Sequence, residues 1–123
     1  MKILIIEDEE MVARTMSKKL VIEGFDALVA LDGLQGLQMA LSEHPDLILL
    51  DLILPKLDGL SMLRKLREDS WGSHVKVIIL SNLSDPGDIT KGVNIGLNDV
   101  SLYLTKTDWS LDDVVTKIRE RLV

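Results

Sequence analysis

The sequence predicts an α/β fold in which a parallel five-stranded sheet is covered by helices on both faces. Short apolar runs suited to strands alternate with segments whose apolar residues recur at helical spacing. Two of these runs, residues 47–50 and 77–80, are apolar at every position, as expected for strands covered on both faces. No repeat, linker or low-complexity segment interrupts the 123 residues. We therefore predict one domain, residues 1–123, with a three-layer, doubly wound (βα)5 architecture.

The first strand is predicted over residues 1–6, where an apolar run stops at the acidic stretch 7–10. A helix begins in that stretch, because carboxylates are favourable near a helix N-terminus. It ends at Gly24 and is followed by a second strand, residues 26–30. The apolar residues of this first helix recur at helical spacing: Val12, Met16 and Leu20.

A second helix opens at the Asp32-Gly33 pair and stops before Pro45, because the residue preceding a proline disfavours helical backbone. The third strand, residues 47–50, leads through a loop into a third helix within residues 55–69. The apolar residues of the second helix are Leu34, Leu37 and Leu41, and those of the third are Leu60, Leu63 and Leu66.

The last part of the chain supplies a fourth strand over residues 75–80, a short helix within residues 85–96 and a fifth strand over residues 102–105. Ser110 and Asp113 match a capping box, in which each side chain accepts the other residue's main-chain N–H. A final helix follows, with one apolar face: Leu111, Val114, Val115, Ile118 and Leu122.

The composition argues against several classes of function. With 20 acidic and 14 basic residues, the net charge of −6 argues against direct nucleic-acid binding, which needs clustered Lys and Arg. The absence of cysteine excludes disulfides and thiol chemistry. No apolar run reaches the roughly 18 residues of a membrane span, and the N-terminus lacks the layout of a signal peptide. We expect a cytoplasmic protein without a membrane partner.

Asp51 is the most informative residue, because it stands inside the apolar stretch ILLDLIL. A buried carboxylate without a partner is costly. In open parallel sheets, ligands bind beyond the carboxyl ends of the strands, where the strand order reverses. In the flavodoxin-like order 2-1-3-4-5 that point lies between strands one and three, which would place Asp8 directly beside Asp51.

Other polar residues follow the remaining strands at the same edge: Glu7 and Asp8, then Ser81, then Lys106. Crowded carboxylates repel one another unless a cation is present, and a few hard oxygen ligands suit Mg²⁺. An ammonium and a hydroxyl could bind an added phosphoryl group. The combination suits phosphoryl transfer to a carboxylate.

Taken singly, most of these residues have a simpler explanation. The acids at positions 7–10 could simply be residues that favour the start of a helix. Ser81 could be an ordinary loop residue, and Lys106 could be a solvated surface lysine. Asp58-Gly59 is most simply a turn or helix-start signal. The agreement of four strand ends favours a site.

Four segments resemble the receiver domain of two-component response regulators, over essentially the whole chain: MKILIIEDEE, DLILLDLILPKLDGL, VIILSN and YLTK. The resemblance implies a phosphoacceptor switch that assists its own phosphorylation and dephosphorylation, rather than a classical enzyme. Asp51 would accept a phosphoryl group from a sensor histidine kinase or a phosphotransfer protein. Glu7, Asp8, Asp51 and the main-chain carbonyl of Ile53 would hold Mg²⁺, or Mn²⁺ in its place, with Asp8 as a direct ligand and Glu7 acting mainly through water.

The resemblance also implies how the signal leaves the site. Lys106 and Ser81 would bind the phosphoryl group, and Ser81 and Tyr103 would move together as a switch. The surface of helix four, strand five and helix five would then change its preference for an output protein, or for an output domain beyond Val123. A phosphorylation-dependent homodimer is a further expectation.

The chain departs from the family pattern in three places. Thr107 follows Lys106 where the family usually has a cis proline; a cis bond to another residue costs about 3–4 kcal/mol, so we expect a trans bond or a strained loop. Asn82 replaces a smaller residue and narrows access to the site. Residues 96–103 are about three residues longer than the compact family version.

Two other functions compete with the phosphorylated switch. A phosphatase of the haloacid dehalogenase type also uses an Asp nucleophile with Mg²⁺, but it needs a second acid where this chain has Ile53. A receiver-like interaction module that works without phosphorylation is the alternative that Thr107 leaves open.

Overall fold

In the computed structural model, parallel strands form one sheet in the order β2-β1-β3-β4-β5. The structure describes residues 1–51, 54–81, 102–105 and 110–122. The strands are β1 (Lys2–Ile6), β2 (Asp26–Ala30), β3 (Leu47–Asp51), β4 (Lys76–Ser81) and β5 (Leu102–Thr105). Every neighbouring pair of strands runs parallel. The predicted fold class and strand order are thereby confirmed.

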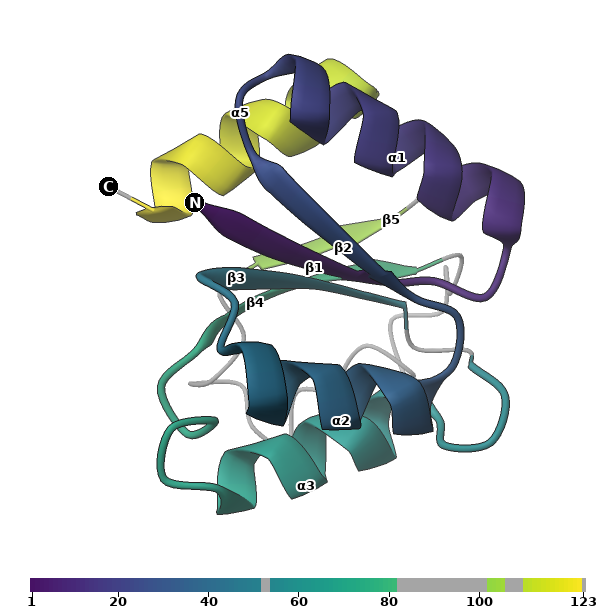
Figure 1. The fold of residues 1–123 in the computed structure, drawn as a ribbon, viewed down its shortest axis with the longest axis vertical. Helices are drawn as coiled ribbons and strands as arrows, with labels where there is room; N and C mark the ends of the chain where they lie inside the picture. Colours follow the sequence, from purple (N-terminus) through teal and green to yellow (C-terminus); the bar gives the residue numbers. More distant parts are fainter. Residues whose placement is uncertain (52–53, 82–101, 106–109, 123) are drawn as a thin grey trace.

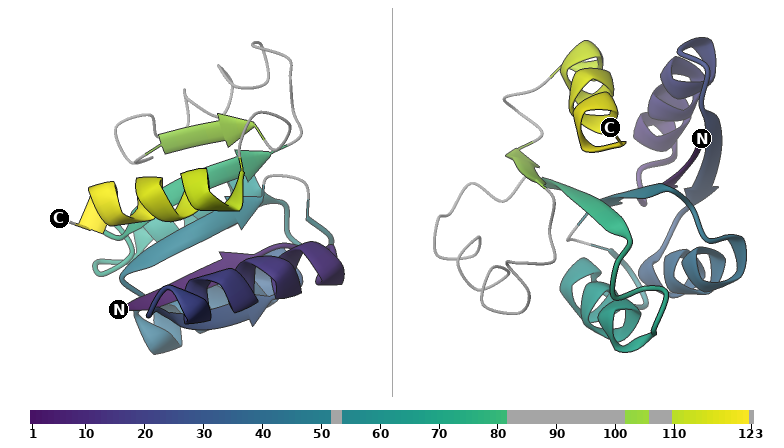
Figure 2. Two further views of the ribbon diagram at one scale, coloured as in Figure 1. Left: turned by 90° about the horizontal axis from the view of Figure 1, so that it is seen from above. Right: turned by 90° about the vertical axis from the view of Figure 1, so that its left-hand side faces the viewer.

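Helices cover both faces of the sheet, which gives the molecule three layers (Figure 1). The helices α1 (Glu10–Ile22) and α5 (Leu111–Leu122) lie on one face, and α2 (Gly33–Glu43) and α3 (Gly59–Glu68) lie on the other. The right-hand view of Figure 2 shows the sheet between these two pairs. The helix predicted within residues 85–96 lies outside the described residues. Within the described ranges, no helix has both the length and the apolarity to cross a bilayer.

Among the described residues, the core consists of two apolar clusters, one on each face of the sheet. Along β1, Ile3 and Ile5 belong to the cluster under α1 and α5, whereas Leu4 and Ile6 belong to the one under α2 and α3. All four side chains are at most 1% exposed. Because successive strand residues point to opposite faces and both faces are covered, every position in the covered part of the strand has to be apolar. This explains the continuous apolar runs in the sequence.

The buried face of α2 matches the predicted leucine face only in part, because Leu37 packs against the core but Leu34 and Leu41 are exposed. Leu34 and Leu41 are 46% and 38% exposed, although the helical periodicity marks them as the apolar residues of this helix. Its buried residues are instead small: Gly33, Gly36 and Ala40. A Cβ atom at Gly36 would lie 2.6 Å from Cδ1 of Ile6, so the helix lies too close to the sheet for larger side chains.

The starts of α3 and α5 have side-chain caps at acids that the sequence marks. Asp58 accepts the main-chain N–H of Ser61 at 2.9 Å at the start of α3, which confirms the helix-start interpretation. At the start of α5, the N–H of Ser110 donates to Asp113 at 3.1 Å and the N–H of Asp113 donates to the Ser110 hydroxyl at 3.2 Å. The predicted capping box is confirmed.

Replacing Asp58 with alanine is expected to lower the free energy of unfolding by about 1 kcal/mol at neutral pH, because the cap of α3 is lost. The N–H of Ser61 lowers the pKa of the Asp58 carboxyl in the folded chain. The charge-dependent part of the stabilisation is therefore complete above the unfolded-state pKa of about 4, and is lost as the pH falls through the lower folded-state pKa.

Urea unfolding of the wild type, Asp58→Ala and Asp58→Ser between neutral and acidic pH measures this effect. Serine keeps a capping oxygen without the titrating carboxyl, so Asp58→Ser should recover most of the stability lost in Asp58→Ala. The difference in the free energy of unfolding between the wild type and Asp58→Ser should shrink as the pH falls. A difference that stays constant down to acidic pH would contradict the role of the charged Asp58 carboxylate in capping α3.

Candidate functional site

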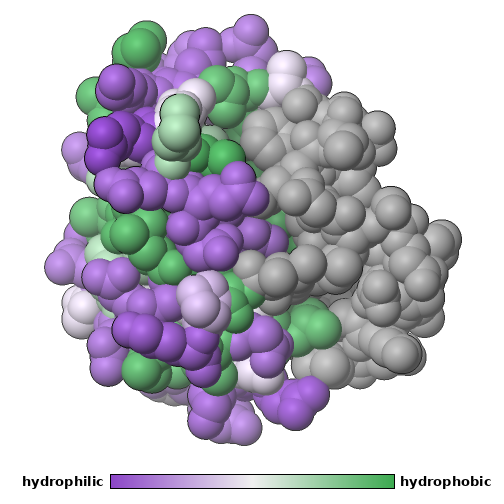
Figure 3. All heavy atoms as spheres, turned by 90° about the vertical axis from the view of Figure 1, so that its right-hand side faces the viewer, coloured by the Kyte–Doolittle hydropathy of each residue, from purple (hydrophilic) through white to green (hydrophobic). Residues whose placement is uncertain are grey.

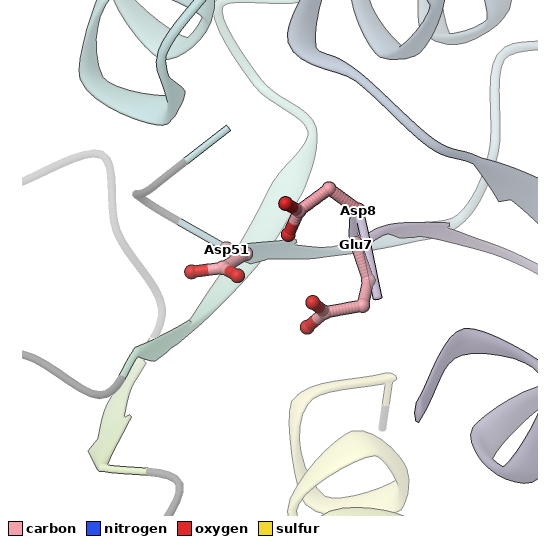
Figure 4. A group of neighbouring side chains, drawn as sticks. All are labelled: Glu7, Asp8 and Asp51. Atoms are coloured by element: carbon pink, nitrogen blue, oxygen red, sulfur yellow. The ribbon is translucent and has the colours of Figure 1, made fainter. Parts of the chain in front are cut away.

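Three carboxylates come together at the carboxyl edge of the sheet, on the right-hand side of Figure 1. Glu7 and Asp8 directly follow β1, and Asp51 is the last residue of the neighbouring strand β3. The register pairs Ile6 with Leu50, so the acids begin at matching positions on the two strands. Their ligand oxygens all lie within 4.8 Å of one another. Figure 4 shows the three side chains converging on a common space.

Two of these acids are buried and one faces solvent. Glu7 is 1% exposed and Asp51 6%, whereas Asp8 is exposed. The backbone of Glu7 is fixed by its N–H, which donates to the carbonyl of Ala30 at 3.0 Å. Its carboxylate accepts the N–H of Glu9 at 3.2 Å. The two buried carboxylates are held in place by the fold, and the exposed carboxylate of Asp8 keeps the site open to water.

The donor set fits a hard divalent cation. Three carboxylates in close proximity repel one another, and a cation between them removes that repulsion. Mg²⁺ prefers oxygen ligands and keeps several of its waters, so it is bound by a few carboxylates at an open site rather than by a closed protein cage. Figure 3 views this edge of the molecule, and the described part is mainly hydrophilic with separate apolar spots. The acidic cluster thus has the chemistry of a divalent metal site.

The acids of the stretch 7–10 divide into two groups. The helix α1 begins at Glu10, which lies in its first turn and pairs with Arg14 at 2.6 Å. Glu9 is the N-cap residue, and its side chain makes no capping hydrogen bond. Glu7 and Asp8 precede the helix altogether. The simple explanation as first-turn acids therefore applies to Glu10 and not to the two acids near Asp51.

The described main chain brings further predicted positions to the same edge. In the register of the sheet, Asp51 pairs with Leu80, and Ser81 pairs with Thr105. Thr105 is the last residue of β5 and directly precedes Lys106 in the chain. Lys106 and Ile53 lie outside the described residues, as do Asn82, Thr107 and all but the end of the lengthened segment 96–103. Tyr103 is placed by its backbone alone, opposite Ile79. The roles of these residues stay predictions.

Sequence reasoning missed a contact between the start of α2 and the loop that follows Asp51. The N–H of Gly33 points to the carbonyl of Pro55 at 3.4 Å, and Lys56 pairs with Asp32 at 3.6 Å. A signal for the close approach was present in the sequence. The smallest residues of the helix recur at helical spacing: Gly33, Gly36 and Ala40.

Comparison with known proteins supports the same family over almost the whole chain. The response regulator receiver domain model matches residues 3–119. The chain is 38% identical over 121 residues to the probable transcriptional regulator ycf27 of Porphyridium aerugineum, which covers 98% of this chain and 48% of that protein. The chain thus spans about half the length of that curated relative.

Solved structures agree with the fold. The Francisella response regulator 1452 receiver domain has a TM-score of 0.87 and 30% identity, covering 98% of this chain and 95% of that one. The receiver domain of a Pseudomonas aeruginosa sensor histidine kinase, which holds a magnesium ion in its active-site cleft, has a TM-score of 0.87 and 26% identity, covering 98% and 96%.

The sheet order, the acidic cluster at its carboxyl edge and the family match over residues 3–119 lead to one assignment. Relatives named as response regulators match the chain too, and phosphorylation-based signalling fits this family. The chain belongs to the response regulator receiver domain family.

Proposed function

We propose that Asp51 is the phosphoacceptor of this receiver domain. The observation that supports the proposal is the convergence of the Glu7, Asp8 and Asp51 carboxylates, with Asp51 at the end of a central strand. A carboxylate oxygen of Asp51 attacks the phosphorus of a phosphohistidine, on a sensor histidine kinase or a phosphotransfer protein. The new oxygen–phosphorus bond forms as the nitrogen–phosphorus bond breaks, and the imidazole keeps the electron pair of that bond.

The acidic cluster is proposed to hold Mg²⁺, or Mn²⁺ in its place. Glu7, Asp8 and Asp51 would supply carboxylate oxygens, and the resemblance adds the main-chain carbonyl of Ile53. When bound, the cation neutralises charge on the carboxylates and on the phosphoryl oxygens that approach them. The buried position of Glu7 keeps one ligand oxygen fixed, while the exposed Asp8 leaves the cation accessible to the donor.

The remaining roles follow from the family and from the order of the strands. Lys106 would pair with the phosphoryl group, Ser81 would hydrogen-bond it, and Tyr103 would move with Ser81. Phosphorylation would then shift an existing equilibrium between two conformations of the surface that contacts the output protein or output domain. The same proposal has four further parts. Residues 1–123 form a single domain, the protein is cytoplasmic, it does not bind nucleic acid directly, and phosphorylation promotes a homodimer.

Incubation with Mg²⁺ and a small acyl phosphate tests the proposed function. The wild-type chain is expected to gain the mass of one phosphoryl group in intact-protein mass spectrometry, because the Asp51 carboxylate can attack an activated phosphate directly, without a kinase. Chelation of the metal should prevent the gain. No gain with Mg²⁺ present would favour an interaction module that works without phosphorylation. Continued phosphate release from many phosphate esters would favour the phosphatase.

A further inference from the structure

The first turn of α2 touches both chain segments that carry the acidic cluster. On one side it meets the loop that follows Asp51, through Gly33. On the other side it meets the end of β1, through Gly36 and Ile6, the residue directly before Glu7. The helix itself contributes no carboxylate to the cluster. Its contacts suggest a role in placing the residues that do.

Gly33 and the loop meet main chain to main chain. A Cβ atom at Gly33 would lie 1.6 Å from the carbonyl oxygen of Leu57 and 2.6 Å from its carbonyl carbon. Such distances cannot be relieved by turning a side chain, because the obstructing atoms are backbone. The N–H of Gly33 also points to the carbonyl oxygen of Pro55 at 3.4 Å. Any side chain at position 33 would therefore displace the loop.

The loop forms a tight turn at this contact. The N–H of Leu57 donates to the carbonyl of Pro55 at 2.7 Å, and Lys56 between them has a φ of 65°. A turn of this kind is uncommon for a residue with a side chain and persists only where its surroundings hold it in place. The Lys56 ammonium lies 3.6 Å from the carboxylate of Asp32, which also caps α2 by accepting the N–H of Gln35 at 2.7 Å.

Gly36 makes the second contact, and that one is softer. A Cβ atom there would lie 2.6 Å from Cδ1 and 2.9 Å from Cγ2 of Ile6. These atoms belong to a side chain, so a smaller residue at position 6 could make room. The two glycines thus offer one rigid and one adjustable contact on the same helix.

We propose that Gly33 is a positioning residue for the metal site. By letting α2 lie directly against residues 55–57, it holds the described part of the segment that follows Asp51, while Gly36 lets the same helix lie against Ile6, the residue before Glu7. The metal site is the proposed one, so the inference rests on the proposed function. A larger side chain at position 33 moves the loop and weakens divalent metal binding.

If Gly33 and Gly36 made no close contacts, replacing either one with alanine should raise the free energy of unfolding. Alanine is a better helix former than glycine, so the helix itself would become more stable. The matched control is Gly24, which has a φ of +95° and no atom within 4 Å of its would-be Cβ. Gly24→Ala introduces backbone strain far from the acidic cluster.

Isothermal titration of the phosphate-free chain with Mg²⁺ tests the inference. We expect Gly33→Ala to bind Mg²⁺ about tenfold more weakly than the wild type, whereas Gly24→Ala loses thermal stability and keeps the wild-type affinity. Gly36→Ala should bind more weakly as well, and adding Ile6→Ala, which removes Cδ1, Cγ1 and Cγ2 of that side chain, should restore the affinity. Backbone amide hydrogen exchange at Leu57 should be faster in Gly33→Ala.

The possible results separate the inference from the proposed function. Wild-type affinity in Gly33→Ala would overturn the positioning role, provided that the wild type binds Mg²⁺. Failure of the wild type to bind Mg²⁺ would overturn the proposed function instead. If Gly33→Ala does not fold, Gly36→Ala with and without Ile6→Ala decides. A loss of affinity in Gly36→Ala that Ile6→Ala does not restore would count against positioning by α2.

Discussion

Replacing Asp51 with asparagine is expected to abolish phosphoryl uptake, both from a phosphorylated kinase and from a small acyl phosphate. The amide of asparagine has nearly the same shape as the carboxylate, but it carries no negative charge and is a poor nucleophile towards phosphorus. Asp51 is 6% exposed at the end of a central strand, so the substitution leaves its packing nearly unchanged. Intact-protein mass spectrometry after incubation with Mg²⁺ and the donor measures the effect.

A matched control is available at the opposite end of the sheet. Asp46 is exposed, precedes β3 instead of ending it, and accepts the main-chain N–H of Lys2 at 2.7 Å. Asp46→Asn removes the same charge from the same segment and should leave phosphoryl uptake unchanged. Full uptake by Asp51→Asn would show that another residue accepts the phosphoryl group, and peptide mapping of the modified residue would then identify it.

Replacing Asp8 with asparagine is expected to lower the affinity for Mg²⁺ about a hundredfold, or about 2.8 kcal/mol. The carboxylates of Glu7, Asp8 and Asp51 lie within 4.8 Å of one another, so a cation between them interacts strongly with each charge. Even at a protein surface, two unit charges about 4 Å apart attract by about 4 kcal/mol, and part of this is spent on removing water. Calorimetric titration of the phosphate-free chain gives the dissociation constants directly.

The neighbouring acid provides the control for this substitution. Glu9 is exposed, and its main-chain N–H donates to the Glu7 carboxylate. Glu9→Gln removes one negative charge near the site without removing a proposed ligand, and solvent and salt screen such an exposed charge. The affinity of the Glu9→Gln variant for Mg²⁺ should stay within about twofold of that of the wild type. Equal losses in Asp8→Asn and Glu9→Gln would mean that the general negative field, rather than coordination by Asp8, attracts the cation.

Much of the fold was predictable because the signals are local. The strands of the central sheet are covered on both faces, so their residues have to be apolar throughout, as in residues 47–50. The start of α5 was predictable from Ser110 and Asp113, because a capping box acts within one turn of helix. Asp51 was identified because a carboxylate in an apolar run needs a reason to be there.

The candidate site was predictable in part, because parallel strands carry their last residues to one edge. Given the strand order, Glu7 and Asp8 had to lie near Asp51, and their ligand oxygens do lie within 4.8 Å of one another. The sequence did not reveal that Glu7 is almost fully buried while Asp8 is exposed. Burial depends on which elements cover a residue. Glu7 and Asp8 are adjacent in the chain, but Glu7 is covered by the fold and Asp8 is exposed to solvent.

Residue type and spacing along the chain were enough to predict the order of the elements, the parallel sheet and the acids at its carboxyl edge. Only the tertiary structure decided which face of α2 is buried, and that Gly33 lies against the carbonyl of Leu57. Helical periodicity records which residues are apolar, and it favoured Leu34 and Leu41. The distance between two packed elements depends on both at once, and at a close contact the smallest residue is buried instead of the most apolar one.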